Sequence, residues 1–276
     1  MIPQDFDALT KKIEECFLEE PGPGILPESR DNDDAIAGIL APYGDYSKAG
    51  FSMSWAYKTI AETRFKDTFI IIGCRKGNST LIDRDIETPL GVVRTDQDMV
   101  MALKRLTRIA SKGNEEIDTS ITLQLPFLQY ASRDRLSNLK VVCLEIGDNI
   151  AEEQLQVLAE AMRMILKEQK KDCSVICSTN LTEYGEGFGY KPFIYNVKES
   201  IENIDYHIID SIGKKDHKDI IRFVEKEKAN VRGYKSIALL MMLLKDYDSK
   251  LLQYYRSDLM DKENKDTTSY LSMYFL

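Results

Sequence analysis

The chain has 276 residues, of which 43% are hydrophobic and 30% charged, values that are ordinary for a folded globular protein. Its net charge of −8 argues against nucleic-acid binding, because no overall basic field would attract a polyanion. No run approaches the roughly 18 apolar residues of a membrane span, and the first residues lack the basic start of a signal peptide, so we expect a cytoplasmic protein outside the membrane.

The first half of the chain alternates between helical and strand-like patterns. Leu9, Ile13 and Phe17 recur at helical spacing, and that helix must end before the Pro-Gly-Pro-Gly segment at 21–24. The run 68–73 is continuously apolar and β-branched and ends at a glycine, which is typical of a buried strand. Together the patterns predict helices over 7–19, 52–64 and 97–110, strands over 35–41 and 68–73, and a turn at 87–91.

The second half continues this alternation. A helix with apolar residues at helical spacing is predicted over 152–169, between apolar strands at 139–146 and 173–178. Strand–helix–strand units of this kind are right-handed and build a parallel sheet. Further helices are predicted over 200–212, 216–227 and 234–245, and closing strands over 251–256 and 269–275. We therefore predict one α/β domain spanning 1–276, with a mixed, mostly parallel central sheet flanked by helices.

Three of the predicted strands lead into loops that carry polar or charged residues. These strands are 35–41, 68–72 and 173–178. In sheets of this class ligands bind in the crevice beyond the carboxyl ends of the strands. The sequence therefore predicts a site at that edge of the sheet.

The chain resembles the Memo family, which is related to class III extradiol ring-cleaving dioxygenases. The most specific matches are ETPLG at 87–91 and QLPFLQY at 124–130, and the resemblance extends over nearly the whole chain. It implies that family's fold. Ten positions match its site motifs and are expected to line a pocket: Tyr43, Asp45, Arg75, Lys76, Asp118, Thr119, Thr122, Asn180, Glu183 and Arg232.

At five of these positions the chain departs from the family. Where the resemblance implies metal-type histidines, the sequence has Tyr43, Lys76, Thr119 and Glu183, and Arg232 replaces a cysteine. Lysine and arginine have no usable lone pair at neutral pH and repel a divalent cation. A tyrosine and a glutamate can hold an oxygen-preferring ion, but two such ligands beside two cations make a poor centre. We therefore expect no metal, no cofactor and no catalytic residue.

The first interpretation is a pseudo-enzyme that works by binding, either as a scaffold for a protein partner or as a receptor for a ligand. In one version, Arg75, Lys76, Arg232 and Lys235 pair with Asp45, Asp118 and Glu183 and fill the space of the lost metal. In another, the cations hold a small phosphate or carboxylate anion, for which arginine offers a planar fork. The sequence leaves both versions open, together with the oligomeric state.

The alternative interpretation is an enzyme that needs no metal. Neighbouring cations can lower the pKa of Tyr43 enough for general acid–base catalysis. The same effect beside Arg75 and Lys76 can make Cys74 a reactive thiolate. No histidine lies near this thiol to serve as its base, so an inert Cys74 is the favoured prediction.

The remaining features favour structural roles. We expect His207 and His217, the two histidines of the chain, to lie on the surface, and all five cysteines to be reduced. The glycine-rich segment 185–190 is predicted to be a flexible rim loop, and the apolar run 239–244 a core helix. The tyrosine-rich segment 270–275 is predicted to be an alternating strand.

Overall fold

The computed structural model describes residues 2–30, 34–113, 115–259 and 266–276. At its centre four parallel strands lie in the order β1 (Gly38–Ala41), β8 (Cys173–Ser178), β2 (Thr68–Arg75) and β7 (Lys140–Gly147). Their register places Ile70 opposite Val175 on one side, and Ile72 opposite Leu144 on the other. The carboxyl ends of all four strands therefore reach the same edge of the sheet.

The outer strands make the sheet mixed. On one side β1 pairs with β11, and β11 with β10, both antiparallel. On the other side β3 pairs antiparallel with β7 and parallel with β6, while β5 lies parallel to β7 and forms a hairpin with β4. The bounds are β3 (Thr80–Ile82), β4 (Ile86–Thr88), β5 (Gly91–Thr95), β6 (Ala110–Lys112), β9 (Glu183–Tyr184, paired with β11), β10 (Ser249–Arg256) and β11 (Thr267–Phe275).

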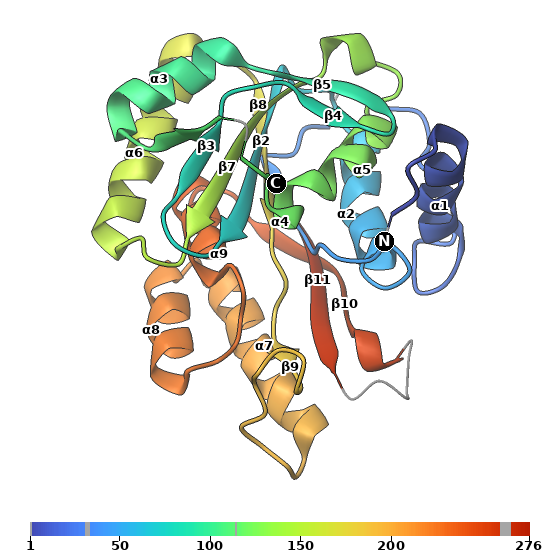
Figure 1. Ribbon diagram of the computed structural model, residues 1–276, viewed down its shortest axis with the longest axis vertical. Coiled ribbons are helices and arrows are strands. Elements are labelled where there is room, and N and C mark those ends of the chain that lie inside the picture. The colour runs from blue at the N-terminus through green and yellow to red at the C-terminus, as the bar shows by residue number, and fades with distance from the viewer. Residues whose placement is uncertain (1, 31–33, 114, 260–265) are drawn as a thin grey trace.

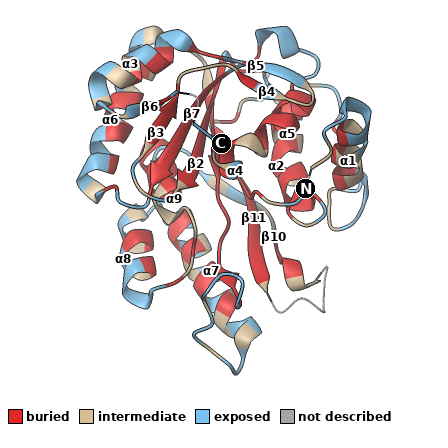
Figure 2. Cartoon of the chain, viewed as in Figure 1, coloured by how far each residue is buried: buried red, intermediate tan, exposed pale blue. Residues whose placement is uncertain are grey.

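Helices cover both faces of the sheet, which explains why its central strands are continuously apolar (Figures 1 and 2). In β2, Ile70 and Ile72 face one core, whereas Phe69 and Ile71 face the other. The first core packs against α3 (Gln97–Thr107), α6 (Glu152–Gln169), α7 (Val197–Gly213), α8 (His217–Glu227) and α9 (Tyr234–Leu243). The second packs against α1 (Phe6–Leu18), α2 (Gly50–Glu62) and α5 (Gln124–Ala131).

The single α/β domain with a mixed, mostly parallel sheet is confirmed. The bounds of α6 and β8 are those predicted, and the apolar run 239–244 is buried within and just after α9. The first strand is shorter than predicted, since it begins at Gly38 rather than at residue 35. No helix in the described ranges combines the length and the apolar character needed to cross a membrane.

Two sequence predictions hold only in part, for reasons that the packing explains. The segment 270–275 is a strand, as predicted, but it does not alternate between buried and exposed side chains: Leu271, Met273 and Phe275 lie in the first core, Tyr270 lies in the second, and Tyr274 alone in the segment is partly exposed. His207 lies at the surface, as predicted, with its side chain 39% exposed, but it is held by protein contacts: its ring stacks on Phe223, with centroids 3.8 Å apart, and its Nε2 lies 2.8 Å from Asp219 Oδ2. His217 is also partly covered, and its Nε2 is shielded from solvent.

Candidate functional site

The candidate site lies at the carboxyl edge of the parallel strands. Tyr43 follows β1, Lys76 follows β2, and Asn180 follows β8. Two further segments approach from the side: Asp118 precedes the short helix α4 (Thr119–Thr122), and Arg232 lies between α8 and α9. The fold thus brings together residues that are up to 189 positions apart in sequence, from 43 to 232.

Tyr43 is directed inward and bonds to a buried thiol. The phenol is 5% exposed and its Oη lies 3.6 Å from Cys74 Sγ. Arg232 lies over its ring, with Cζ 5.8 Å from the centroid. Burial raises the pKa of Tyr43 well above its ordinary value, and the neighbouring guanidinium opposes this only in part. The expected lowering of this pKa is therefore wrong, because desolvation outweighs the attraction of the cation.

Arg232 also forms an ion pair. Its Nη2 lies 3.2 Å from Asp118 Oδ2, and the other oxygen of Asp118 accepts the Ser120 N–H at 2.8 Å. This carboxylate caps α4 and fixes the guanidinium at the same time. The side chain of Arg232 is 40% exposed, so solvent screening keeps the contribution of the pair to stability small.

Glu183 is the second acid of the site, and it is buried. Its side chain accepts a hydrogen bond from Asn180 Nδ2 at 3.2 Å, while Asn180 Oδ1 accepts the Tyr43 N–H at 3.1 Å. The residue is 8% exposed, and burial raises the pKa of its carboxyl above the ordinary value despite the hydrogen bond and the charge of Arg232. Burial therefore favours the neutral form of this carboxyl.

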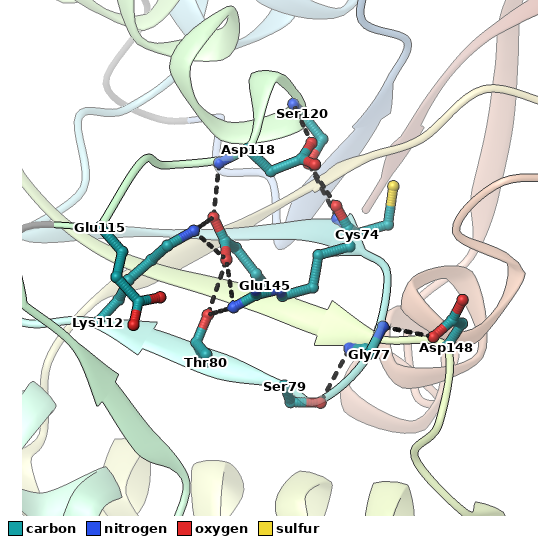
Figure 3. A network of polar contacts seen from close by, with 12 residues as sticks. Cys74, Gly77, Ser79, Thr80, Lys112, Glu115, Asp118, Ser120, Glu145 and Asp148 are labelled. Carbon is teal, nitrogen blue, oxygen red and sulfur yellow. Dashed lines mark hydrogen bonds and ion pairs between the residues drawn. The ribbon is translucent and has the colours of Figure 1, made fainter.

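A third acid, Glu145, anchors the site from below, and the sequence analysis missed it (Figure 3). It is fully buried in β7 and accepts hydrogen bonds from Thr80 Oγ1 at 2.7 Å, Lys112 Nζ at 3.0 Å and the Asp118 N–H at 2.7 Å. Arg75 Nη1 approaches it to 3.4 Å. The sequence does mark this residue: it is the single glutamate inside the apolar run 139–146, and a buried charge requires partners nearby.

Backbone contacts fix the loops around these side chains. Asp205 Oδ1, in α7, accepts two hydrogen bonds from Thr182, one from its backbone N–H at 3.0 Å and one from its hydroxyl Oγ1 at 2.7 Å. The carbonyl oxygen of Asn230 accepts the Glu183 N–H at 3.0 Å, and Asn230 Nδ2 donates to the carbonyl oxygen of Glu183 at 2.8 Å. These contacts connect the loop after β8 to α7 and to the segment before Arg232.

Two cavities open at the site and share one wall. The first has a volume of about 410 Å³ and reaches from Cys74 and Glu183 to Phe188 and Tyr234. The second, of about 390 Å³, reaches from Lys112 and Glu116 to Thr119. Arg75, Lys76 and Arg232 line both cavities.

A larger surface groove, of about 1010 Å³, lies elsewhere, between α2 and β10. Its arginine, Arg30, already bonds to Asp134 and to the carbonyls of Ile60, Thr63 and Ala131. The groove is therefore wide, but this cation has its donors engaged within the protein. The two smaller cavities bring together more of the charged and polar residues that were predicted to line a site.

Most of the ten predicted positions meet here. Arg75, Lys76, Glu183 and Arg232 line the first cavity, and Asp118 and Thr119 the second. Tyr43 and Asn180 lie buried behind them. Asp45 lines neither cavity and is exposed, with Oδ1 accepting from Ser47 Oγ at 2.7 Å. Thr122 is half-buried in α4 and also lines neither cavity.

Comparison with known proteins decides the family. A family model described as Memo-like protein matches residues 1–274. The chain belongs to the Memo family. It is 27% identical to the MEMO1 family protein MK0963 of Methanopyrus kandleri, over 99% of this chain and 95% of that protein. It is also 27% identical to the MEMO1 family protein TK1477 of Thermococcus kodakarensis, with 88% of each chain covered.

A solved structure supports the fold alone. The uncharacterized protein JW3007 of Escherichia coli K12 superposes with a TM-score of 0.52 at 10% identity, covering 87% of this chain and 99% of that one. At this identity the likeness concerns the arrangement of strands and helices. The site of this Memo-family protein has to be interpreted from its own residues.

The donor set of the site fits a metal poorly. Among the described residues, no group of three or more histidine, cysteine or acidic side chains is placed to hold an ion. The positions that resemble metal-ligand positions present a phenol bonded to a thiol, a buried glutamate bonded to Asn180, and the cations Lys76 and Arg232. A soft transition metal needs converging imidazoles or thiolates instead.

We predict that Cys74 reacts slowly with iodoacetamide. The residue is 4% exposed, and burial raises the pKa of its thiol, although Tyr43 and Arg232 oppose the rise. At pH 8 we expect alkylation at least about tenfold slower than in guanidinium-unfolded protein, because the thiolate is the nucleophile. Peptide mass spectrometry over time measures this. Equal rates in folded and unfolded protein would restore the reactive-thiolate hypothesis.

Proposed function

We propose that this Memo-family protein acts by binding at the family's site and that it does so without a metal ion or catalysis. The supporting observation is that two of the substituted side chains bond to neighbouring residues of the site: Arg232 to Asp118 and Tyr43 to Cys74. The phenol of Tyr43 and the guanidinium group of Arg232 therefore bond to residues of the same chain, while two cavities remain open beside them. The proposal includes the cytoplasmic location expected from the sequence.

Metal retention tests this proposal. Untagged protein is incubated with Fe(II), Cu(II) or Zn(II), desalted, and measured by inductively coupled plasma mass spectrometry. We expect far less than one equivalent of each metal. A variant with Tyr43→His, Lys76→His, Thr119→His and Glu183→His serves as the comparison, because it restores imidazoles at the four positions and should retain more metal.

Near-stoichiometric retention by the unchanged protein would contradict the proposal. If Tyr43→Phe and Glu183→Gln then abolished that retention, these two residues would be ligands. A redox function would return as the leading hypothesis. Circular dichroism on each variant ensures that a lost metal is not a lost fold.

A further inference from the structure

The wall shared by the two cavities carries hydrogen-bond donors that the protein does not use. We call Arg75, Lys76 and Arg232 the basic wall. Within the described ranges, Lys76 is exposed and makes no ion pair or hydrogen bond. Among the residues that the structure describes, Arg75 bonds through Nη1 alone, toward Thr80 and Glu145, and Arg232 through Nη2 alone, toward Asp118. The free N–H groups of both guanidinium ions and the ammonium group of Lys76 are open to a ligand.

Three of the four acids around the basic wall accept hydrogen bonds within the protein. Asp118 accepts from Ser120 and Arg232, and Asp148 Oδ1 accepts the Gly77 N–H at 2.6 Å. Glu183 accepts a hydrogen bond from Asn180 Nδ2 at 3.2 Å, and burial raises the pKa of its carboxyl. The cavities are lined by five basic side chains, namely Arg75, Lys76, Lys112, Arg232 and Lys235, and by four acidic ones, namely Glu116, Asp118, Asp148 and Glu183.

This local balance differs from that of the chain as a whole, whose net charge is −8. An anion approaching elsewhere meets an acidic protein, whereas at the basic wall it meets three cations with unused donors. Charge-assisted hydrogen bonds from arginine and lysine are the strongest that side chains offer to a carboxylate or a phosphate. The 410 Å³ cavity has the size of a small-molecule pocket, and Ile146, Phe188 and Val231 add apolar surface to its lining.

We propose that the basic wall binds the carboxylate or phosphate group of a small anion whose body lies in the 410 Å³ cavity. This inference rests on the proposed binding function and names its ligand class. Lys76 supplies a point charge, and the two guanidinium groups supply directed N–H donors. The charge of Arg232 is shared between the ligand and Asp118, so its ion pair need not break.

Isothermal titration calorimetry with inorganic phosphate, pyrophosphate and citrate tests this inference. The unchanged protein should bind at least one of the three, more weakly at 0.5 M than at 0.05 M NaCl. Lys76→Gln and Arg232→Ala should each weaken that binding by about tenfold or more. Lys11→Gln on α1 is the matched control, since it removes the same charge from an exposed position outside both cavities and should change nothing.

Lys76→Gln also protects the test against a folding artefact, because this exposed side chain makes no contact whose loss would unfold the protein. Comparison of phosphate with citrate distinguishes a phosphate site from a carboxylate site. Equal binding by the unchanged protein, Lys76→Gln and Arg232→Ala would overturn the inference, and so would no binding of any probe.

The failure of this inference differs from a failure of the proposed function. Suppose that no anion binds, but a neutral compound protects the protein against thermal unfolding, and Phe188→Ala abolishes that protection. The binding function then stands and only the ligand class is wrong. Stoichiometric metal retention would overturn the proposed function itself, whatever the anions do.

Discussion

Replacing Glu145 by alanine should lower the free energy of unfolding by about 3–5 kcal/mol, the usual cost of removing one partner from a buried ion pair. The substitution leaves Lys112 uncompensated, and the side chain of that lysine is only 5% exposed. It also removes the acceptor of the Asp118 N–H and of Thr80 Oγ1. Urea unfolding followed by circular dichroism measures the loss.

The double variant Glu145→Ala with Lys112→Met is the control for this explanation. If the unpaired ammonium group causes the loss, the double variant should recover a large part of it, because an apolar side chain can occupy the site without a partner. A loss below about 1 kcal/mol in the single variant would mean that Lys112 reaches solvent, and the anchoring role of Glu145 would have to be abandoned.

Gly147→Ala is the second substitution with a large expected effect. A Cβ at this position would lie 2.0 Å from the carbonyl oxygen of Gly77, 2.6 Å from the carbonyl carbon of Asn78 and 2.7 Å from the nitrogen of Ser79. All three are backbone atoms, so the loop after β2 must move as a whole. We expect a loss of about 3 kcal/mol, at the upper end of the cost of overpacking.

The same movement should displace Lys76, which is the first residue of this loop. Thermal unfolding measures the stability loss, and phosphate or pyrophosphate titration measures the effect on the basic wall. Gly213→Ala is the matched control, because nothing lies within 4 Å of a Cβ built at the end of α7. An unchanged midpoint for Gly147→Ala would show that the loop has room to shift at little cost.

The sequence predicted the elements whose patterns are long and regular. The helix over 152–169 shows its buried face as Leu155, Leu158 and Met162, so both its type and its bounds could be inferred. The strand at 173–178 is buried on both faces, and only a central strand explains such a run. These elements depend on local pattern alone.

Other elements depend on tertiary contacts that no local pattern reveals. Every residue of α5 is buried, so the segment 124–131 lacks the polar face that identifies a helix. The strands β3, β4 and β6 have three residues each and are defined only by their neighbours. Polar helical surroundings suggested that His207 lies at the surface, and its side chain is 39% exposed, but no local pattern could show that Phe223 of the following helix stacks on its ring.

The candidate site could be predicted in its location and only partly in its chemistry. The resemblance brought Tyr43, Glu183 and Arg232 to one pocket, and the structure places them together. The sequence could not show that the phenol and Cys74 bury each other, which reverses the expected direction of the tyrosine pKa. It also could not show that Asp45 bonds to Ser47 outside both cavities, because such pairing depends on the path of the loop.

The four parallel strands at the centre hold one another through backbone hydrogen bonds, in pairs such as Leu40 with Cys177 and Ile72 with Leu144. The substituted side chains Tyr43, Lys76 and Arg232 stand in loops outside these pairs, whereas Arg75 and Glu145 lie within the paired strands. Mutations in the loops are therefore easier to accommodate than mutations in the strands. During evolution the loops can therefore lose one chemistry and acquire another while each successive sequence still folds.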